Sequence, residues 1–244
     1  MNPRPKIVAF LSLLLALSGV SPLWAADPAE GAPKRGNARF YHMHASFLER
    51  AAEGPVGLLF LGDSITEGWR KVPELWESAW GQYQPANFGI GGDQTQHVIW
   101  RIEDGELDKI SPKVVVLMIG TNNTGGNTAE EITAANKKIV NLIREKLPET
   151  KVLLLAIFPR GPRTSGNGVV ENGKDRMAKI DAINAEMAKW DDGERVFFLN
   201  INDVFLNDEG KIPDEIMPDQ LHPNAKGYAL WVEAMAPTVE KLMK

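Results

Sequence analysis

Three side chains of this sequence could together perform nucleophilic catalysis: Ser64, Asp219 and His222. Ser64 follows the apolar run 56–61 after Gly62 and Asp63, where a buried strand would give way to a helix. A serine hydroxyl becomes a nucleophile when a histidine takes its proton, and a carboxylate orients that histidine. Asp219 and His222 are three residues apart, so one tight loop could place the carboxylate against one imidazole nitrogen and leave the other free. Together the three residue types could attack an acyl carbon.

Each part of this set has a plainer interpretation. Asp63 and Ser64 could simply cap a helix, because both residue types favour the N-cap position. Asp219 and His222 could be a helix cap or half of a metal site. No further histidines or paired carboxylates stand at ligand spacing, however, and the chain has no cysteine. The sequence therefore predicts no metal and no cofactor.

The first 26 residues differ from the rest of the chain. Arg4 and Lys6 precede the apolar run 7–17, and Ala25 and Ala26 provide a small-residue cleavage site. This pattern is typical of a secretory leader, with an uncleaved membrane anchor as the alternative. We therefore expect a periplasmic or secreted protein without a membrane span in its mature form.

The composition limits the number of domains and the binding partners that the mature chain could have. The 244 residues are 43% hydrophobic and 24% charged, which suits one globular domain. Removing the leader takes away two positive charges and no negative ones, so the formal net charge changes from −5 to −7. Such an acidic protein is a poor candidate for binding nucleic acid or anionic membrane surfaces.

Predicted strands and helices alternate along the chain without a repeat. The expected strands are residues 56–61, 84–88, 113–120, 151–158 and 195–200. The expected helices are residues 38–52, 72–82, 95–105, 129–147, 174–190 and a last helix ending near residue 242. This alternation predicts an α/β architecture with a parallel sheet and helices on both faces.

Two segments are expected to lack regular structure. Residues 27–37 are rich in proline, glycine and alanine, and we interpret them as a flexible linker. Residues 159–173 are predicted to form a glycine-rich loop, the candidate for a mobile rim. The predicted helix 38–52 carries His42 and His44, which we expect to serve the surface or packing.

Polar or glycine-rich segments follow two of the predicted strands. Three glycines stand in four positions at 89–92, which indicates positive φ angles or a close approach of the backbone. The spacing lacks the Lys-Ser/Thr of a P-loop and the full dinucleotide motif, so we do not expect nucleotide binding. Thr121, Asn122 and Asn123 follow the strand 113–120. Both segments would meet Ser64 at the carboxyl edge of the sheet.

These motifs together resemble the SGNH (GDSL-type) esterase superfamily. The motifs that carry the resemblance, in chain order, are Gly62-Asp63-Ser64, Gly92 after Asn87-Phe88-Gly89-Ile90-Gly91, Gly120-Thr121-Asn122-Asn123, and Asp219-x-x-His222-Pro223. Residues 89–101 and 114–126 resemble its platelet-activating-factor acetylhydrolase catalytic-subunit branch. The match runs from about Phe40 to the C-terminus. It implies a flavodoxin-like three-layer sandwich, with about five parallel strands, in a domain of residues 38–244.

The resemblance also implies roles for five residues. Ser64 corresponds to the nucleophile, His222 to the general base and Asp219 to the residue that orients the base. Gly92 and Ser64, through their backbone N–H groups, and Asn122, through its side-chain amide, correspond to the oxyanion hole. Preorganised donors beside a developing negative oxygen are typically worth about 3 kcal/mol each. No Gly-x-Ser-x-Gly motif is present, so a typical α/β-hydrolase is not expected.

Four other residues are weaker candidates for substrate contact. Asp63 precedes the serine and is assigned to holding the loop, since Asp219 already serves His222. Trp69, Trp100 and Arg160 could form a sugar platform or an acyl pocket.

The resulting hypothesis is an exported serine esterase that removes small acyl groups, acetyl by analogy with the family branch, through an acyl-enzyme. An O-acetylated carbohydrate suits an exported acidic protein, and a short-chain lipid or phospholipid ester is the alternative substrate. A catalytically silent glycan-binding module on the same fold is the alternative of another class. The family branch also implies a possible homodimer through the helix 38–52.

Overall fold

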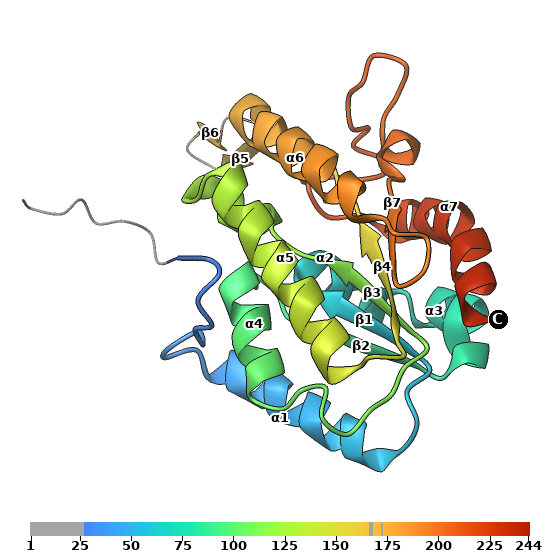
Figure 1. Ribbon diagram of the computed structural model, residues 1–244. Coiled ribbons are helices and arrows are strands. Elements are labelled where there is room, and N and C mark those ends of the chain that lie inside the picture. The colour runs from blue at the N-terminus through green and yellow to red at the C-terminus, as the bar shows by residue number, and fades with distance from the viewer. Residues whose placement is uncertain (1–26, 166–167, 172) are drawn as a thin grey trace, which may run out of the picture.

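A five-stranded parallel sheet forms the centre of the protein (Figure 1). The computed structural model describes residues 27–165, 168–171 and 173–244, so the predicted leader lies outside the described residues. The strands, in spatial order, are β2 Pro85–Gly89, β1 Leu58–Gly62, β3 Val114–Met118, β4 Lys151–Leu155 and β7 Val196–Leu199. The predicted α/β fold with about five parallel strands is confirmed.

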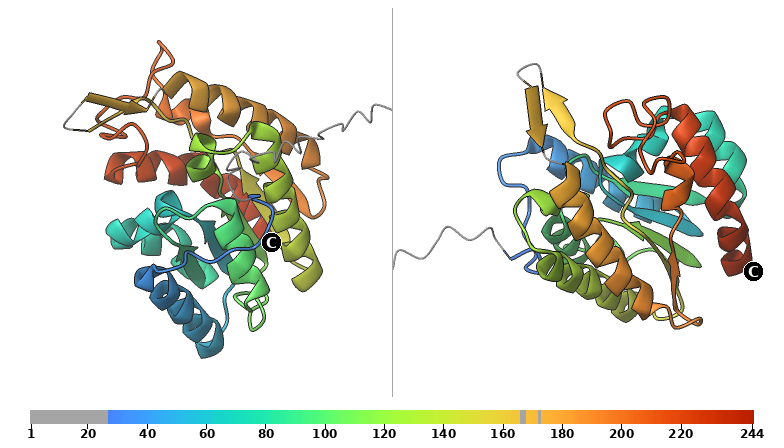
Figure 2. Two further views of the ribbon diagram at one scale, coloured as in Figure 1. Left: turned by 90° about the vertical axis from the view of Figure 1, so that its left-hand side faces the viewer. Right: turned by 90° about the horizontal axis from the view of Figure 1, so that it is seen from above.

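Helices cover both faces of this sheet (Figures 1 and 2). One face carries α1 Ala38–Glu53, α4 Thr95–Glu103, α5 Ala129–Lys146 and α6 Gly173–Met187. The other carries α3 Pro73–Trp80 and α7 Ala225–Met243. Side chains of β1 alternate between the two layers, since Leu59 and Leu61 pack in the first core and Leu58 and Phe60 in the second. Every β1 residue is thus buried, as its unbroken apolar sequence predicts.

The remaining elements are short. The four-residue helix α2 spans Ser64–Glu67. The 3₁₀ turns are η1 Gly68–Lys71, η2 Gly81–Tyr83, η3 Thr121–Gly125, η4 Ala188–Trp190 and η5 Asn202–Phe205. Most predicted bounds differ from the observed ones by only a few residues. The α5 start matches closely, because Thr128 and Glu131 form the expected reciprocal capping box.

The strand register places three carboxyl ends level with one another. Gly62 at the end of β1 pairs with Gly89 of β2 on one side and with Met118 of β3 on the other. The segments that follow these strands therefore emerge at the same edge of the sheet.

Part of the predicted 159–173 loop is a β-hairpin. β5 Arg163–Ser165 and β6 Gly168–Glu171 pair antiparallel and project from the body of the molecule (Figure 2). The loop prediction is wrong for these residues. β-Branched residues flank a Gly-Asn dipeptide in this stretch, which is a hairpin signal that the high glycine content obscures.

Residues 27–37 lie against the domain rather than hanging free of it. The hydroxyl of Thr95 donates to the carbonyl of Pro28 at 3.0 Å, and the N–H of Ala32 donates to the carbonyl of Gln96 at 3.0 Å. The segment also accepts a hydrogen bond at 2.8 Å from Lys138 on α5. The partners of this segment are more than 60 residues away in sequence. Composition alone therefore predicts a flexible linker, although residues 27–37 pack on α4 and α5.

Candidate active site

Ser64 lies at the turn between β1 and α2. Asp63 caps α2, with its Oδ1 accepting a hydrogen bond of 3.0 Å from the N–H of Ile65. From α7, the hydroxyl of Tyr228 donates to the carbonyl of Ile65 at 2.6 Å. Gly62 allows the turn to close, because a Cβ there would lie 2.2 Å from the hydroxyl oxygen of Thr66. The turn thus holds Ser64 at the carboxyl edge of the sheet.

Ser64, His222 and Asp219 form a continuous hydrogen-bonded series across 158 residues of sequence separation. The Oγ of Ser64 is 2.8 Å from Nε2 of His222, and Nδ1 of His222 is 2.6 Å from Oδ2 of Asp219. The other oxygen of Asp219 accepts from the backbone N–H of His222 at 2.7 Å and of Leu221 at 3.2 Å. One carboxylate therefore shapes the loop and contacts the imidazole at the same time.

This geometry has a direct chemical meaning. A carboxylate beside Nδ1 favours the imidazole tautomer with its proton on that nitrogen. Nε2 of His222 is then a free acceptor, 2.8 Å from the hydroxyl of Ser64. The arrangement can take a proton from the serine as the serine attacks.

The glycine segment after β2 forms a turn beside Ser64. The N–H of Asp93 donates to the carbonyl of Ile90 at 3.0 Å, and Gly92 has a φ of +72°, which favours glycine. A Cβ on Gly91 would lie 3.9 Å from Cβ of Ser64. The N–H of Gly91 donates to Oε2 of Glu67 at 2.7 Å, which fixes the turn to α2.

Asn122 joins the serine turn to the glycine turn. Its Nδ2 donates to the carbonyl of Asp93 at 2.8 Å and lies 3.3 Å from Oδ2 of Asp63. Asp63 immediately precedes Ser64, and Asp93 immediately follows Gly92. The structure therefore brings together the three residues that the sequence suggested as oxyanion donors.

The carboxyl group of Asp63 is almost fully buried between these segments. Burial, together with the nearby charge of Asp93, raises the pKa of Asp63 to about 7, against the hydrogen bond from Ile65 and the charges of Lys34 and Arg160. Asp63 lies behind Ser64 and contacts Asn122. This position fits the expected role in holding the loop.

A surface pocket of about 600 Å³ opens at Ser64 and His222. Most of its lining residues carry polar or charged groups, but carbon atoms make up most of the exposed lining surface. The lining residues are Ser64, Glu67, Gly68, Arg70, Lys71, Pro218, Asp219, His222, Pro223 and Asn224. No Phe, Tyr or Trp is among these lining residues.

The structure does not bring Trp69, Trp100 or Arg160 to this pocket. Trp69 is 1% exposed and packs in an aromatic cluster against Tyr228 and other rings of the second core. Trp100 packs against Phe40 where α4 meets α1. Both tryptophans serve packing, which corrects their assignment to a sugar platform or acyl pocket.

Arg160 is also buried, at 3% exposure. Its Nη1 donates to the carbonyl and the hydroxyl of Thr121, at 3.0 and 3.1 Å. Arg160 thus holds the start of η3, the turn that carries Asn122. The predicted contact of Arg160 with substrate is therefore wrong, and Arg160 supports that turn instead.

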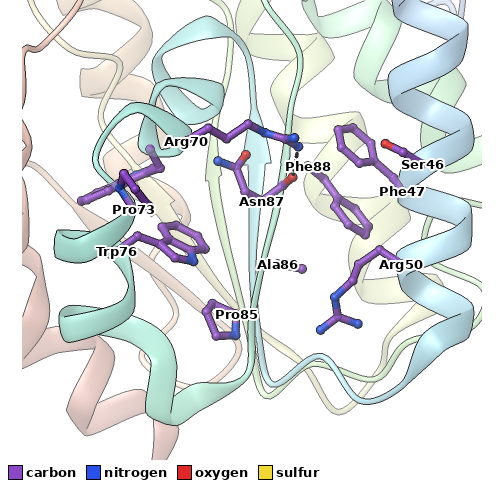
Figure 3. Close-up of a pocket in the computed structure, with 11 residues that line it drawn as sticks. Ser46, Phe47, Arg50, Arg70, Pro73, Trp76, Pro85, Ala86, Asn87 and Phe88 are labelled. Atoms are coloured by element: carbon purple, nitrogen blue, oxygen red, sulfur yellow. Dashed lines mark hydrogen bonds between the residues drawn. The ribbon is translucent and has the colours of Figure 1, made fainter.

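A second pocket, of about 330 Å³, lies at the outer edge of β2 between α1 and α3 (Figure 3). Phe47, Trp69, Trp76 and Phe88 give it an aromatic lining. Arg70 borders both pockets and donates to the carbonyl of Asn87 at 3.0 Å. His222 and Ser64 do not line this second pocket, so it is separate from the candidate active site.

Sequence reasoning missed three contacts of the site. Glu67 holds the glycine turn, Tyr228 holds the serine turn, and Lys34 contacts the glycine turn from the N-terminal segment. None of the three contacts has a local signal in the sequence, because Glu67, Tyr228 and Lys34 each reach their partners only through tertiary packing.

Among the described residues, no helix has both the length and the apolar character needed to cross a membrane. Within the same residues, no three or more His, Cys, Asp or Glu side chains gather as a metal site would require.

Comparison with known proteins gives concordant matches. The family model described as GDSL-like Lipase/Acylhydrolase family matches residues 60–230. Platelet-activating factor acetylhydrolase IB subunit alpha1 from Bos taurus is 35% identical over 204 residues, covering 84% of each chain. A GDSL-like lipase structure from Bacteroides thetaiotaomicron has a TM-score of 0.65 and 20% identity, covering 81% of this chain and 97% of that one. A carbohydrate esterase family 3 structure from Talaromyces cellulolyticus has a TM-score of 0.53 and 22% identity, covering 77% and 98%.

Proposed function

The chain belongs to the GDSL-like lipase/acylhydrolase family, and on that premise we propose that it is a serine esterase that releases small acyl groups, acetyl above all, through an acyl-enzyme. Membership makes the chain an ester-hydrolysing enzyme. The observation that carries the finer proposal is the 2.8 Å contact between Oγ of Ser64 and Nε2 of His222, continued at 2.6 Å to Asp219.

In the first half-reaction, Nε2 of His222 accepts the proton of Ser64 while the serine oxygen attacks the ester carbonyl carbon. Asp219 stabilises the imidazolium ion that forms. His222 then gives the proton to the leaving alcohol oxygen as the tetrahedral intermediate collapses. Ser64 is left acylated, and the alcohol departs through the open pocket.

Three donors are proposed to receive the negative charge of the intermediate. They are the backbone N–H groups of Ser64 and Gly92 and the side-chain amide of Asn122. One amide hydrogen of Asn122 is engaged with the carbonyl of Asp93 at 2.8 Å. The other faces Asp63 at the longer distance of 3.3 Å, so it is the one available to a substrate oxygen.

In the second half-reaction, water attacks the acyl carbon of acylated Ser64. His222 accepts a proton from the water and returns it to the serine oxygen when the carboxylic acid leaves. No group beyond the five proposed residues is required for the cycle.

An O-acetylated carbohydrate is the proposed substrate class. The pocket at Ser64 carries Glu67, Lys71 and Asn224, whose polar groups can form hydrogen bonds with sugar hydroxyls. The structural likeness to a carbohydrate esterase supports this proposal, because it shows that a protein of similar fold acts on carbohydrate esters. The name of the 35%-identical relative favours the second candidate, a phospholipid bearing a short acyl chain.

The proposed location is the periplasm or the cell exterior. It depends on residues 1–26 acting as a cleaved leader ahead of a hydrolase domain of residues 38–244. N-terminal sequencing of exported protein would test this, because a chain that still began at Met1 would contradict it.

The deciding experiment measures acetate release by the mature protein from acetylated xylan, an acetylated phospholipid and a short-chain aryl ester. Ser64→Ala tests the nucleophile, and Ser46→Ala on the exposed surface of α1 is the matched control. Release from xylan that disappears only in Ser64→Ala would support the proposal. Release from the phospholipid alone would favour the second candidate. Binding of acetylated sugar without any turnover would favour a glycan-binding module.

A further inference from the structure

A lysine of the N-terminal segment contacts the glycine turn. The Nζ of Lys34 lies 2.8 Å from the carbonyl oxygen of Gly91 and 2.7 Å from Oδ1 of Asp93. Its side chain is only 13% exposed, and the Asp93 side chain is fully buried. A methyl group added to Gly92 would lie 3.7 Å from this ammonium group. Lys34 therefore sits directly against the turn that contains the proposed oxyanion donor.

The carbonyl of Gly91 and the N–H of Gly92 belong to the same peptide group. In a planar trans peptide these two bonds point in opposite directions, and the described chain has no cis peptide bonds. Holding the Gly91 oxygen at Lys34 therefore turns the Gly92 N–H away from Lys34. A cation on the carbonyl also polarises the amide, which makes its N–H a stronger donor.

The turn itself leaves this peptide group free to rotate. Gly91 and Gly92 are the two central residues of the turn closed by the hydrogen bond from Asp93 to Ile90. Glycine accepts either sign of φ, so the central peptide group of a Gly-Gly turn can turn over at little steric cost. Turned over, it would present a carbonyl oxygen where a donor is needed and an N–H to the lysine ammonium. The contact with Lys34 opposes this state.

The lysine is held by contacts on both sides. Its own segment is fixed two residues away by the hydrogen bond of 3.0 Å from the N–H of Ala32 to the carbonyl of Gln96. Its partner Asp93 is fixed by Arg101, whose Nη2 lies 3.1 Å from the other carboxylate oxygen. The ammonium therefore has a fixed position from which to orient the peptide group.

We propose that Lys34 is a positioning residue of the esterase, acting through the Gly91–Gly92 peptide group to set the oxyanion donor. This rests on the proposed function, because it assumes that the Gly92 N–H receives the oxyanion. It also gives residues 27–37 a part in catalysis rather than in tethering.

The test compares Lys34→Met, Lys34→Arg and the control Lys138→Met in the mature protein with an aryl acetate. Lys138 contacts Ala29, five residues before Lys34, and Glu103, but neither Lys34 nor the glycine turn. We expect Lys34→Met to lower kcat by about 10-fold or more, less than the 10²–10³-fold typical of deleting a donor itself. KM should change little, because the donor acts on the transition state. Lys34→Arg should recover most of kcat, and Lys138→Met should stay within about twofold of wild type.

A second readout separates positioning from folding. Phenylboronic acid forms a tetrahedral adduct with an active serine, so its inhibition constant should rise in Lys34→Met in parallel with the loss of kcat. Should that variant not fold, Lys34→Met with Asp93→Asn, which removes the buried charge together with its partner, should show the same pattern.

Three results would overturn the inference: an unchanged kcat in Lys34→Met, an equal loss in Lys138→Met, or a loss confined to KM. Failure of the proposed function looks different, because the wild type itself would then show no turnover that depends on Ser64.

Discussion

The two carboxylate oxygens of Asp219 make different contacts. Oδ1 accepts the backbone N–H groups of Leu221 and His222, while Oδ2 faces the imidazole. An asparagine keeps an acceptor for the backbone but loses the charge and offers the wrong group to the ring. The loop and the catalytic contact can therefore be separated by one substitution.

We predict that Asp219→Asn folds normally and loses activity. By analogy with the same change in a serine protease triad, kcat should fall on the order of 10²–10⁴-fold. Steady-state kinetics with an aryl acetate measure this loss, and thermal unfolding measures the fold. Asp208→Asn, an exposed change in the same irregular region, is the control. An active Asp219→Asn enzyme would show that His222 needs no orienting carboxylate.

Asp63 predicts a pH dependence of stability. Its folded pKa of about 7 lies above the ordinary value of 3.8, so between these values the folded state holds a proton that the unfolded state has released. The stabilisation is fully present below pH 3.8 and is lost as the pH rises through 7. The shift corresponds to at most about 4 kcal/mol of the free energy of unfolding.

Asp63→Asn cannot ionise and keeps an acceptor for the N–H of Ile65. Its free energy of unfolding should therefore fall less between pH 5 and pH 8.5 than that of the wild type. Urea denaturation at both pH values measures the difference. Equal slopes for the two proteins would mean that Asp63 titrates normally.

For single residues, the sequence predicts the candidate catalytic groups better than it predicts which side chains are buried. Ser64, Asp219 and His222 stood out because few residue types can perform nucleophilic acyl transfer, and the structure brings them within hydrogen-bond distance. The assignment of Trp69 and Arg160 to substrate contact is wrong because residue type alone does not show whether a large aromatic or charged side chain lies in a pocket or in the core. Burial is decided by the packing of distant segments.

At the scale of elements, α7 links one core to the serine turn. Tyr228 packs on Trp231 and Trp69 in the second core, and its hydroxyl reaches the carbonyl of Ile65, the residue after Ser64. The helix that closes one face of the sheet thus also holds the turn that carries the proposed nucleophile.

Tyr228→Phe tests this link. Removing the hydroxyl leaves the buried Ile65 carbonyl without its side-chain donor, so we expect a loss of about 1–3 kcal/mol in the free energy of unfolding. We also expect a several-fold lower kcat, because Ile65 adjoins Ser64. Urea denaturation and steady-state kinetics measure the two effects. Tyr83→Phe, on η2, is the matched control and should change neither.

Sequence periodicity locates most elements because the central strands β1, β3 and β4 are buried almost throughout and each long helix buries one face. The apolar run of β3 and the capping box of α5 are local signals that tertiary structure did not alter. The β5–β6 hairpin lacks a strong apolar pattern and was predicted as loop. The docking of residues 27–37 has no local signal at all, because it depends on α4 and α5.

At the scale of the whole molecule, the candidate site exists only in the assembled sheet. Ser64, Gly92 and Asn122 follow β1, β2 and β3, whose ends the register holds level. Asp219 and His222 come from the loop before α7, on the other side of the site. Ordered motifs in the sequence indicated this convergence, but the distances follow from strand register and helix packing.

A homodimer through α1 remains a prediction. The apolar surface that α1 exposes determines how tightly two copies could associate. The apolar side chains of α1, including Phe40 and Phe47, are buried within their own chain. Among the described residues, Tyr41 is the single large hydrophobic side chain that is exposed, at 40%. Stable homodimer interfaces are richer in apolar surface than this. A net charge of −7 after loss of the leader would also make two copies repel each other.

We therefore expect the mature protein to sediment mainly as a monomer at micromolar concentration, with any association growing as salt screens the negative charge. Sedimentation velocity at low and high ionic strength measures this directly. Tyr41→Glu should abolish a dimer formed through α1, and Tyr83→Phe should leave it intact. A dimer that persists at nanomolar concentration and survives Tyr41→Glu would mean that another face of the molecule forms the interface, because the outer surface of α1 offers no second apolar contact of that size.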